Sequence, residues 1–265
     1  MNDSRRTIDS NPTTEDHPGV GPGASPERDD AGPGRGSRIL VWDLPTRWFH
    51  WLLAASFAGA FVTADSERWR DIHITLGYTA GVLAVLRVVW GFAGSRYARF
   101  DSFVAGPRRV ACYLRSLVGR RPGHAVGHNP AGGWAILALI GLALTVVATG
   151  LAANAEVGPR GLDDVHEALA NAMLAVVGVH VAGVLVGSLA HRENLIAAMF
   201  TGRKAGVPGD AIRGPRRLAA AALLAVVAGL WTGVLPTPGL PEGTGLTAIT
   251  ANAQRPGDHR GGHDD

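Results

Sequence analysis

Two histidines on one apolar segment have the spacing needed to hold two cofactors at different depths of a membrane. His166 and His180 lie fourteen residues apart within a run that is predicted to be helical. Fourteen residues are close to four turns, so the two imidazoles share a face to within about 40° and lie about 21 Å apart along the axis. The apolar core of a bilayer is about 30 Å thick. One ring is therefore expected near each side, as two flat cofactors with two histidine ligands each would require.

The composition indicates that these histidines belong to membrane helices. Apolar residue types make up 46% of the 265 residues, the mean hydropathy is positive, and charged residues gather in blocks between long apolar runs. These blocks are typical of a protein with several transmembrane segments. Each predicted span is near the length needed to cross, although the last is Ala-rich and only marginally long. The spans are 48–65, 73–92, 133–153, 166–190 and 218–235.

The distribution of basic residues predicts the orientation of the spans. The connection 93–132 is rich in arginine with Asp101 as its one acid, and the segment after the fourth span is also basic. The short connections 66–72 and 154–165 are balanced or acidic. Because basic loops stay in the cytoplasm, we expect the N-terminus inside and, if the fifth span crosses, the C-terminus outside.

Span direction then sorts four histidines by depth. The first span runs outward, so His50 at its start lies near the inner face, whereas the second begins outside and places His73 near the outer face. The fourth span also begins outside, with His166 at its outer end and His180 about four turns inward. Depth alone therefore pairs His50 with His180 and His73 with His166.

Small residues accompany each of the four histidines on the same helical face. Such shallow positions would let a flat ring system lie against the helix, although small residues also serve close packing of membrane helices. They are Ala54, Gly77, Ala170 and Gly183.

Taken singly, the histidines and Arg87 each have more than one interpretation. A neutral histidine in a span can hydrogen-bond to another helix or lie on a proton path, but four histidines paired by depth favour ligands. Arg87, about one and a half turns from the inner end of the second span, either extends to the lipid head groups or neutralises an acidic group of the inner cofactor. The other histidines before the C-terminal tail are interpreted as surface residues: His17, His124, His128 and His191.

The single cysteine limits the redox groups that the chain can hold. With Cys112 alone, no intramolecular disulfide, no Cys-x-x-Cys-His attachment of haem and no four-cysteine iron–sulfur cluster can form. A redox group in this chain must be held by histidines or by a partner.

Three stretches carry a resemblance to a known family. They are VWDLPTRWFHWLL, HITLGYTAGVLAVLRVVWGF and VHEALANAMLAVVGVHVAGVLVGSLAHRENLIAAMFTGRK. Over about residues 40–204, the sequence resembles the bacterial cytochrome b561 and nickel–iron hydrogenase b-type cytochrome family. The resemblance implies a four-helix core that holds two b haems, with one histidine from the first helix, one from the second and two from the fourth. Carried over, His50 and His180 would ligate the inner haem iron, and His73 and His166 the outer one, with Arg87 at a propionate.

The resemblance also implies a function in electron transfer. Iron with two histidine ligands has no open coordination position and exchanges single electrons without binding oxygen. Members of the family carry electrons between an outer-face protein, such as a hydrogenase or a c-type cytochrome, and the quinone pool. Two alternatives stand beside this: a b561-type oxidoreductase that oxidises superoxide or a small reductant by itself, and a haem-free transporter or proton channel. No nucleic-acid partner is expected.

The expected fold is all-α, an integral membrane four-helix bundle with two haems and a fifth C-terminal transmembrane helix. We expect it in the bacterial inner membrane, with a cytoplasmic N-terminus and a periplasmic C-terminus. The expected divisions are a disordered tail at 1–37, the di-haem domain at 38–204, a linker and fifth helix at 205–235, and a disordered tail at 236–265.

Overall fold

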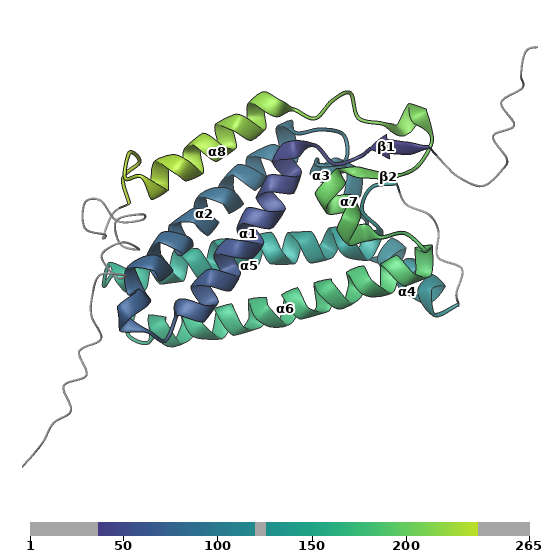
Figure 1. The fold of residues 1–265 in the computed structure, drawn as a ribbon. Coiled ribbons are helices and arrows are strands. Elements are labelled where there is room, and N and C mark those ends of the chain that lie inside the picture. Colours follow the sequence, from purple (N-terminus) through teal and green to yellow (C-terminus); the bar gives the residue numbers. More distant parts are fainter. Residues whose placement is uncertain (1–36, 120–125, 238–265) are drawn as a thin grey trace, which may run out of the picture. The chain divides into compact units, whose positions relative to one another are not determined.

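The computed structural model describes residues 37–119 and 126–237, and this part of the chain is predominantly helical (Figure 1). The expected tails and His124 therefore lie largely outside the described residues. In chain order, the elements are β1 (Arg38–Leu40), α1 (Leu44–Thr63), η1 (Glu67–Trp69), α2 (Arg70–Ala93), α3 (Phe100–Phe103), α4 (Pro107–Val118), α5 (Pro130–Asn154), α6 (Leu162–His191), α7 (Leu195–Thr201), β2 (Arg203–Ala205), η2 (Pro208–Asp210) and α8 (Arg217–Trp231).

Three of the described helices are long and apolar enough to cross a membrane: 67–93, 130–154 and 162–191. Helix α1 has 20 residues but carries Arg47 and His50 in its first two turns, which lowers its hydropathy. The four long helices α1, α2, α5 and α6 begin three or four residues before the predicted spans. The predicted spans cover only the apolar residues, whereas each helix starts at its cap. Asp43 accepts a hydrogen bond from the Thr46 amide (2.8 Å) at the start of α1, and Asn129 accepts one from the Gly132 amide (2.7 Å) at the start of α5.

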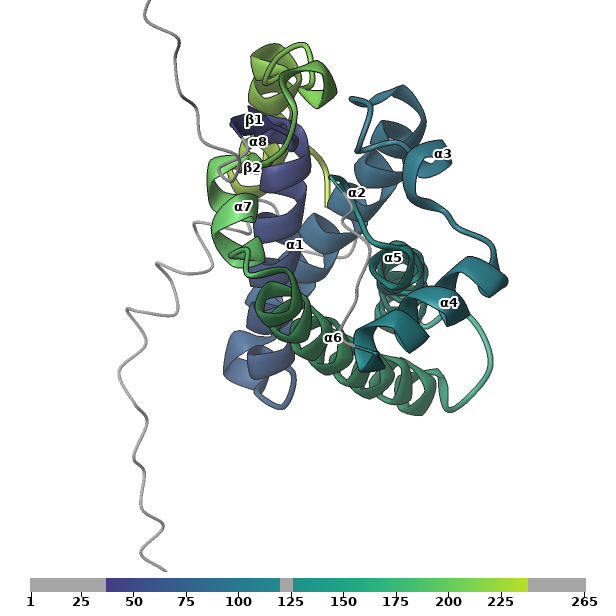
Figure 2. The ribbon, with the colours of Figure 1, turned by 90° about the vertical axis from the view of Figure 1, so that its right-hand side faces the viewer.

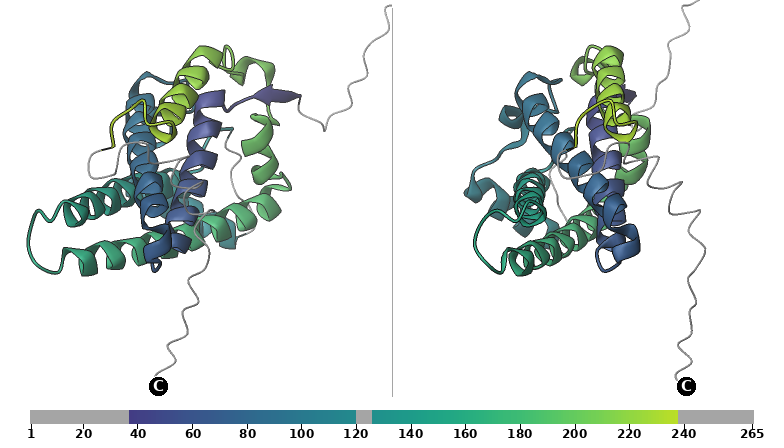
Figure 3. Two further views of the ribbon diagram at one scale, coloured as in Figure 1. Left: turned by 60° about the vertical axis from the view of Figure 1, so that its left-hand side comes forward. Right: turned by 90° about the vertical axis from the view of Figure 1, so that its left-hand side faces the viewer.

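The four long helices α1, α2, α5 and α6 pack on one another. Helix α1 lies against α2, α2 against α5, and α5 against α6. A buried cluster of Ala84, Ala143 and Met173 joins α2, α5 and α6, and Phe57 of α1 packs against it. Gly81 allows α2 to approach α5 closely, since a Cβ there would lie 2.7 Å from Val147 Cγ1. Helix α4 lies beside the ends of α5 and α6 (Figure 2), and Figure 3 shows α5 (teal) and α6 (green) side by side.

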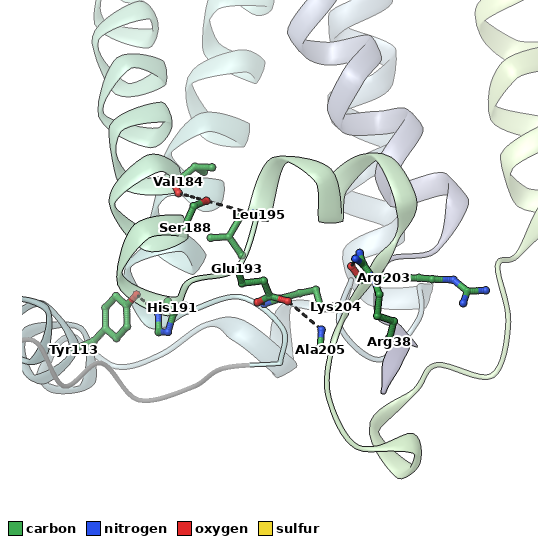
Figure 4. Close-up of polar contacts among 10 residues, drawn as sticks. All are labelled: Arg38, Tyr113, Val184, Ser188, His191, Glu193, Leu195, Arg203, Lys204 and Ala205. Carbon is green, nitrogen blue, oxygen red and sulfur yellow. Dashed lines mark hydrogen bonds and ion pairs between the residues drawn. The ribbon is translucent and has the colours of Figure 1, made fainter. Parts of the chain in front are cut away.

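We call the end with His50, α4 and β1 the inner end, and the end with His73 and η1 the outer end. A two-stranded antiparallel sheet closes the inner end, with Ile39 opposite Lys204. The Lys204 ammonium lies 3.5 Å from a Glu193 carboxylate oxygen, and its side chain is 5% exposed; Figure 4 shows these side chains together. Burial lowers the pKa of Lys204, and the interaction with Glu193 opposes that shift. The sheet therefore joins the segment before α1 to the segment after α7, and the ion pair fixes the second of these segments to the turn after α6.

Helix α8 is shorter than the predicted fifth span. It packs on α1 and α2, with Leu223 in a cluster with Phe49 and Leu83, and the Trp231 indole donates to Thr79 Oγ1 (3.1 Å). Its 15 residues extend about 22 Å, less than the ~30 Å apolar core of a bilayer. The helix ends early because Gly233 takes a φ of 73°, which turns the chain out of the helix. The fifth crossing stays a prediction.

Candidate functional site

The outer end brings His73 of α2 and His166 of α6 together, with ring centres 6.2 Å apart. His73 Nδ1 lies 2.8 Å from the Ala60 carbonyl of α1. His166 Nδ1 lies 2.9 Å from the Val146 carbonyl of α5 and 3.3 Å from Thr149 Oγ1. Because a carbonyl only accepts, each Nδ1 carries the proton and donates it, so each Nε2 keeps a free lone pair. Histidines that ligate metals show this arrangement.

A cavity of about 350 Å³ adjoins the outer histidines. Gly77 and Ala170 are part of its lining, and a Cβ added at Gly77 would meet nothing within 4 Å. Gly150 of α5 has the opposite property, since a Cβ there would lie 2.8 Å from Cε1 of His166. Gly77 therefore leaves space for a ligand, and Gly150 leaves space for the His166 imidazole.

The inner end brings His50 of α1 and His180 of α6 together, with ring centres 6.5 Å apart. His50 Nδ1 is buried and has no hydrogen-bond partner among the described residues. The Trp51 ring lies 4.8 Å from the His50 ring and stacks on Phe200 at 4.2 Å, which covers this side of the pair. A Cβ at Gly183 would meet nothing within 4 Å, so α6 leaves open space one turn from His180.

The ring spacing of both pairs fits one shared metal ion. Two metal–nitrogen bonds of about 2 Å and two imidazole radii of about 1.2 Å place the ring centres about 6.4 Å apart. The observed 6.2 and 6.5 Å lie on either side of that value. The described residues contain no group of three or more histidine, cysteine or acidic side chains that could hold a metal, so the other ligands would have to come from the cofactor. A porphyrin supplies four nitrogens and leaves two axial positions for imidazoles.

The structure thus brings together the same two pairs that span direction predicts. Of the small residues, Gly77 and Gly183 leave open space, and Ala54 is exposed on α1. Four turns of α6 separate His166 from His180, so the pairs lie at opposite ends of the core.

Arg87 of α2 points into the protein at the inner end. The residue is 6% exposed, its Nη2 donates to the Ala98 carbonyl (3.2 Å), and its guanidinium carbon lies 5.6 Å from the centre of the Phe100 ring. Its Nη1 is buried without a hydrogen-bond partner among the described residues. A guanidinium that extends to the lipid head groups would be exposed, so the second alternative, an acidic group of the cofactor, fits this placement better.

His128 is half-buried, whereas the sequence suggests a surface residue. Its ring lies 4.4 Å from the Trp42 ring and 4.9 Å from the Phe103 ring, and its Nδ1 is buried without a partner among the described residues. Burial lowers the pKa of His128 to about 3, and nearby Arg87 and Lys204 add to the shift, with smaller contributions from the inner histidines. The imidazole is therefore neutral near pH 7. No local signal reveals this, because Trp42 reaches His128 only through the tertiary fold.

Comparison with known protein families matches most of the described core. The family model described as "Prokaryotic cytochrome b561" matches residues 41–202. The chain belongs to this family. All four paired histidines and Arg87 lie within the matched residues of this b561 family member, and α8 lies beyond them.

Two relatives of this cytochrome b561 family member come from Escherichia coli. The chain is 26% identical over 143 residues to the "Probable Ni/Fe-hydrogenase 1 B-type cytochrome subunit" of Escherichia coli (strain K12), and the same values hold for the protein of that name from Escherichia coli O157:H7. Each match covers 44% of this chain and 60% of the relative. A comparison with solved structures gives no significant match. These findings support a membrane b-type cytochrome in electron transfer, and the family implies haem b.

Proposed function

We propose that the chain holds two b haems and carries electrons across the bacterial inner membrane. His50 and His180 would ligate the inner haem iron, and His73 and His166 the outer one. The observation that supports this best is the ring spacing of the two pairs, 6.5 and 6.2 Å, which fits a shared metal at each of two positions about four turns apart along α6.

When bound, each haem supplies an iron that takes up and releases one electron. The protein's part would be to hold each iron with two imidazoles, which would leave no position for oxygen or another small ligand. The carbonyls of Ala60 and Val146 fix the orientation of the two outer rings through their hydrogen bonds with Nδ1. Trp51 and Phe200 cover the inner pair and limit the access of water.

We assign to Arg87 the binding of a propionate of the inner haem. Its Nη1 is a buried donor without a described partner, and a carboxylate would satisfy it with a charge-assisted hydrogen bond. Removal of an unpaired donor from water is costly, so a bound anion would also explain why a guanidinium is tolerated at this depth.

The proposed route leads between an outer-face redox protein and the quinone pool. The name of the E. coli relatives favours a hydrogenase as that outer-face protein, with a c-type cytochrome as the alternative. The chain spans 60% of the length of those relatives, and the use of quinone comes from the family resemblance alone. The basic inner connections and the acidic outer ones support a cytoplasmic N-terminus and, if α8 crosses, a periplasmic C-terminus.

The haem content of the purified full chain tests the proposal. A pyridine haemochrome assay should give two haems per chain, and His73→Ala or His180→Ala should each remove one. His191→Ala serves as a matched control, because this histidine is on α6 but contacts Tyr113 of α4, outside both pairs. A colourless protein would favour the haem-free alternative, and one haem per chain, or a loss in the His191 variant, would refute the assignment of the pairs.

The pairing is tested by which histidine variants lose the same component of the visible spectrum. Loss of the same component by His73→Ala and His166→Ala supports it, whereas a component shared by His73 and His180 contradicts it. Oxidation of superoxide by the isolated chain, without a partner protein, would favour the stand-alone oxidoreductase.

A further inference from the structure

A second cavity, of about 550 Å³, lies at the inner end between α3, α4 and the start of α5. It is separate from the cavity beside the outer histidines. Its lining includes Phe103, Arg108, Arg109, Cys112 and His128. The cavity therefore lies between a basic stretch of α4 and the loop that precedes the membrane helix α5.

The charge of this cavity favours an anion. Arg108 and Arg109 are exposed, and neither forms an ion pair with another described residue. The acid in the lining is Asp101, and Arg99 already contacts both of its carboxylate oxygens, at 3.2 and 3.0 Å. Two guanidinium groups thus remain to bind a ligand, and guanidinium binds phosphate with two parallel hydrogen bonds.

Helix α4 is amphipathic and presents these arginines away from the bundle. Tyr113 is buried and its hydroxyl lies 3.5 Å from His191 Nε2 of α6, so this face of α4 packs on the core. Arg108 and Cys112 are four residues apart and share a different side of the helix, where they line the cavity. Arg109, four residues before Tyr113, lies nearer the packed side but is also exposed and part of the lining. The contact of Tyr113 with His191 thus fixes α4 beside the core while both arginines stay exposed.

Exposed apolar side chains lie next to the arginines. Val104, in the lining, is 45% exposed, and Trp134 in the first turns of α5 is 48% exposed. The Trp134 indole donates to the Ala105 carbonyl (2.7 Å), so it is tied to the loop that forms the cavity. An exposed tryptophan at the start of a transmembrane helix is typical of the boundary between head groups and acyl chains. The cavity thus opens at the membrane surface.

We infer that this cavity binds the phosphate head group of an acidic phospholipid of the inner leaflet. Arg108 and Arg109 would hold the phosphate, and Val104 and Trp134 would contact the upper part of an acyl chain. A soluble phosphate would use the arginines alone and would gain nothing from the apolar rim, so the two sources can be separated by experiment. The inference depends on the cavity and its charges and is independent of the number of haems.

Native mass spectrometry of the full haem-loaded chain in detergent tests this site. Phosphatidylglycerol and phosphatidylcholine are titrated separately, and the dissociation constant of the first bound lipid is compared. Each arginine near the membrane surface contributes about five-fold to anionic lipid binding. Arg108→Gln with Arg109→Gln should therefore weaken phosphatidylglycerol binding about thirty-fold and phosphatidylcholine binding by less than about five-fold, since the choline cation offsets the charge of that lipid's phosphate.

A double variant of Arg213→Gln and Arg217→Gln is the matched control. Both arginines are exposed on the inner side and lie outside the cavity lining, so binding should change by less than about two-fold. An equal loss in this control would refute the site, because it would show a general surface potential. Displacement of the lipid by inorganic phosphate at equal concentration, or equal affinity for both lipids, would also refute it. If the double variant loses its haem spectrum, the single variants, each with about a five-fold loss, provide the same test.

Discussion

Substitution of Gly150 by alanine should weaken the outer haem alone. The new Cβ would lie 2.8 Å from Cε1 and 3.0 Å from Nδ1 of His166, whereas ordinary contact begins at 3.4 Å. The imidazole must therefore retreat by about 0.6 Å, which exceeds the tolerance of about 0.5 Å for a functional constellation. The ring cannot retreat freely, since its Nδ1 donates to the Val146 carbonyl.

The size of the effect follows from the cost of overpacking, about 1–3 kcal/mol. If this cost falls on the position of His166, affinity for the outer haem decreases from about five-fold to over a hundred-fold. Alanine also gains about 1 kcal/mol over glycine in a helix interior, so the helix itself should not lose stability.

Gly141→Ala isolates that helix effect, because Gly141 lies on the same α5 helix and a Cβ there would meet nothing within 4 Å. Haem content after gel filtration and a potentiometric titration of each haem are the measurements. We expect Gly150→Ala to lose or shift the outer haem and Gly141→Ala to keep both haems. If the two variants give the same haem content and the same two midpoint potentials, His166 does not ligate iron in the described position.

Three further changes test the inner end. Arg87→Gln should lower the midpoint potential of the inner haem and leave that of the outer haem unchanged, because loss of a nearby positive charge favours the oxidised iron. Arg87→Lys should give an inner-haem potential between those of the unaltered chain and Arg87→Gln. An equal shift of both haems would contradict the assignment. Lys204→Met should destabilise the fold by about 1–3 kcal/mol, since it leaves the half-buried Glu193 carboxylate with the Ala205 amide but without its cation. The double change with Glu193→Gln should cost less. Chemical denaturation of the single and double variants measures this, and additive losses would show that the pair does not interact. Trp90→Phe removes the indole that donates to Asp43 Oδ2 (3.2 Å) and should cost about 1.5–3 kcal/mol, visible as a lower melting temperature; a melting temperature equal to that of the unaltered chain would show that this hydrogen bond contributes nothing.

Helix direction and rise per residue predict which histidines meet. A membrane restricts each helix to one of two directions, so the position of a histidine along its helix gives its depth. The placement of His50 with His180 and of His73 with His166 followed from that restriction. The caps at Asp43 and Asn129 extend α1 and α5 beyond the apolar runs, and hydropathy alone does not predict such ends.

The remaining features depend on contacts that no local pattern predicts. The hydrogen bond from His166 Nδ1 to Val146 requires the register of α6 on α5. The neighbours of His128 in the sequence suggest a surface residue. Its actual contacts, Trp42 and Phe103, come from other parts of the chain. The Ala-rich run of α8 continues into Gly233, whose positive φ ends the helix before the predicted span is complete.

The β1–β2 sheet has a consequence for the order in which the chain assembles. Arg38 and Arg203, which are linked across this sheet, are separated by 165 positions. Synthesis at 5–20 residues per second would take about 10–30 s to reach the second strand. The pairs α1–α2 and α5–α6 are each formed by neighbouring long helices, and their contacts can form as soon as each pair has been inserted. The strand that precedes α1 must wait without its partner until α7 has been made. Closure of the sheet thus comes late in core assembly, before only the packing of α8, and a ribosome that stalls before residue 203 would leave the edge of β1 open to other chains.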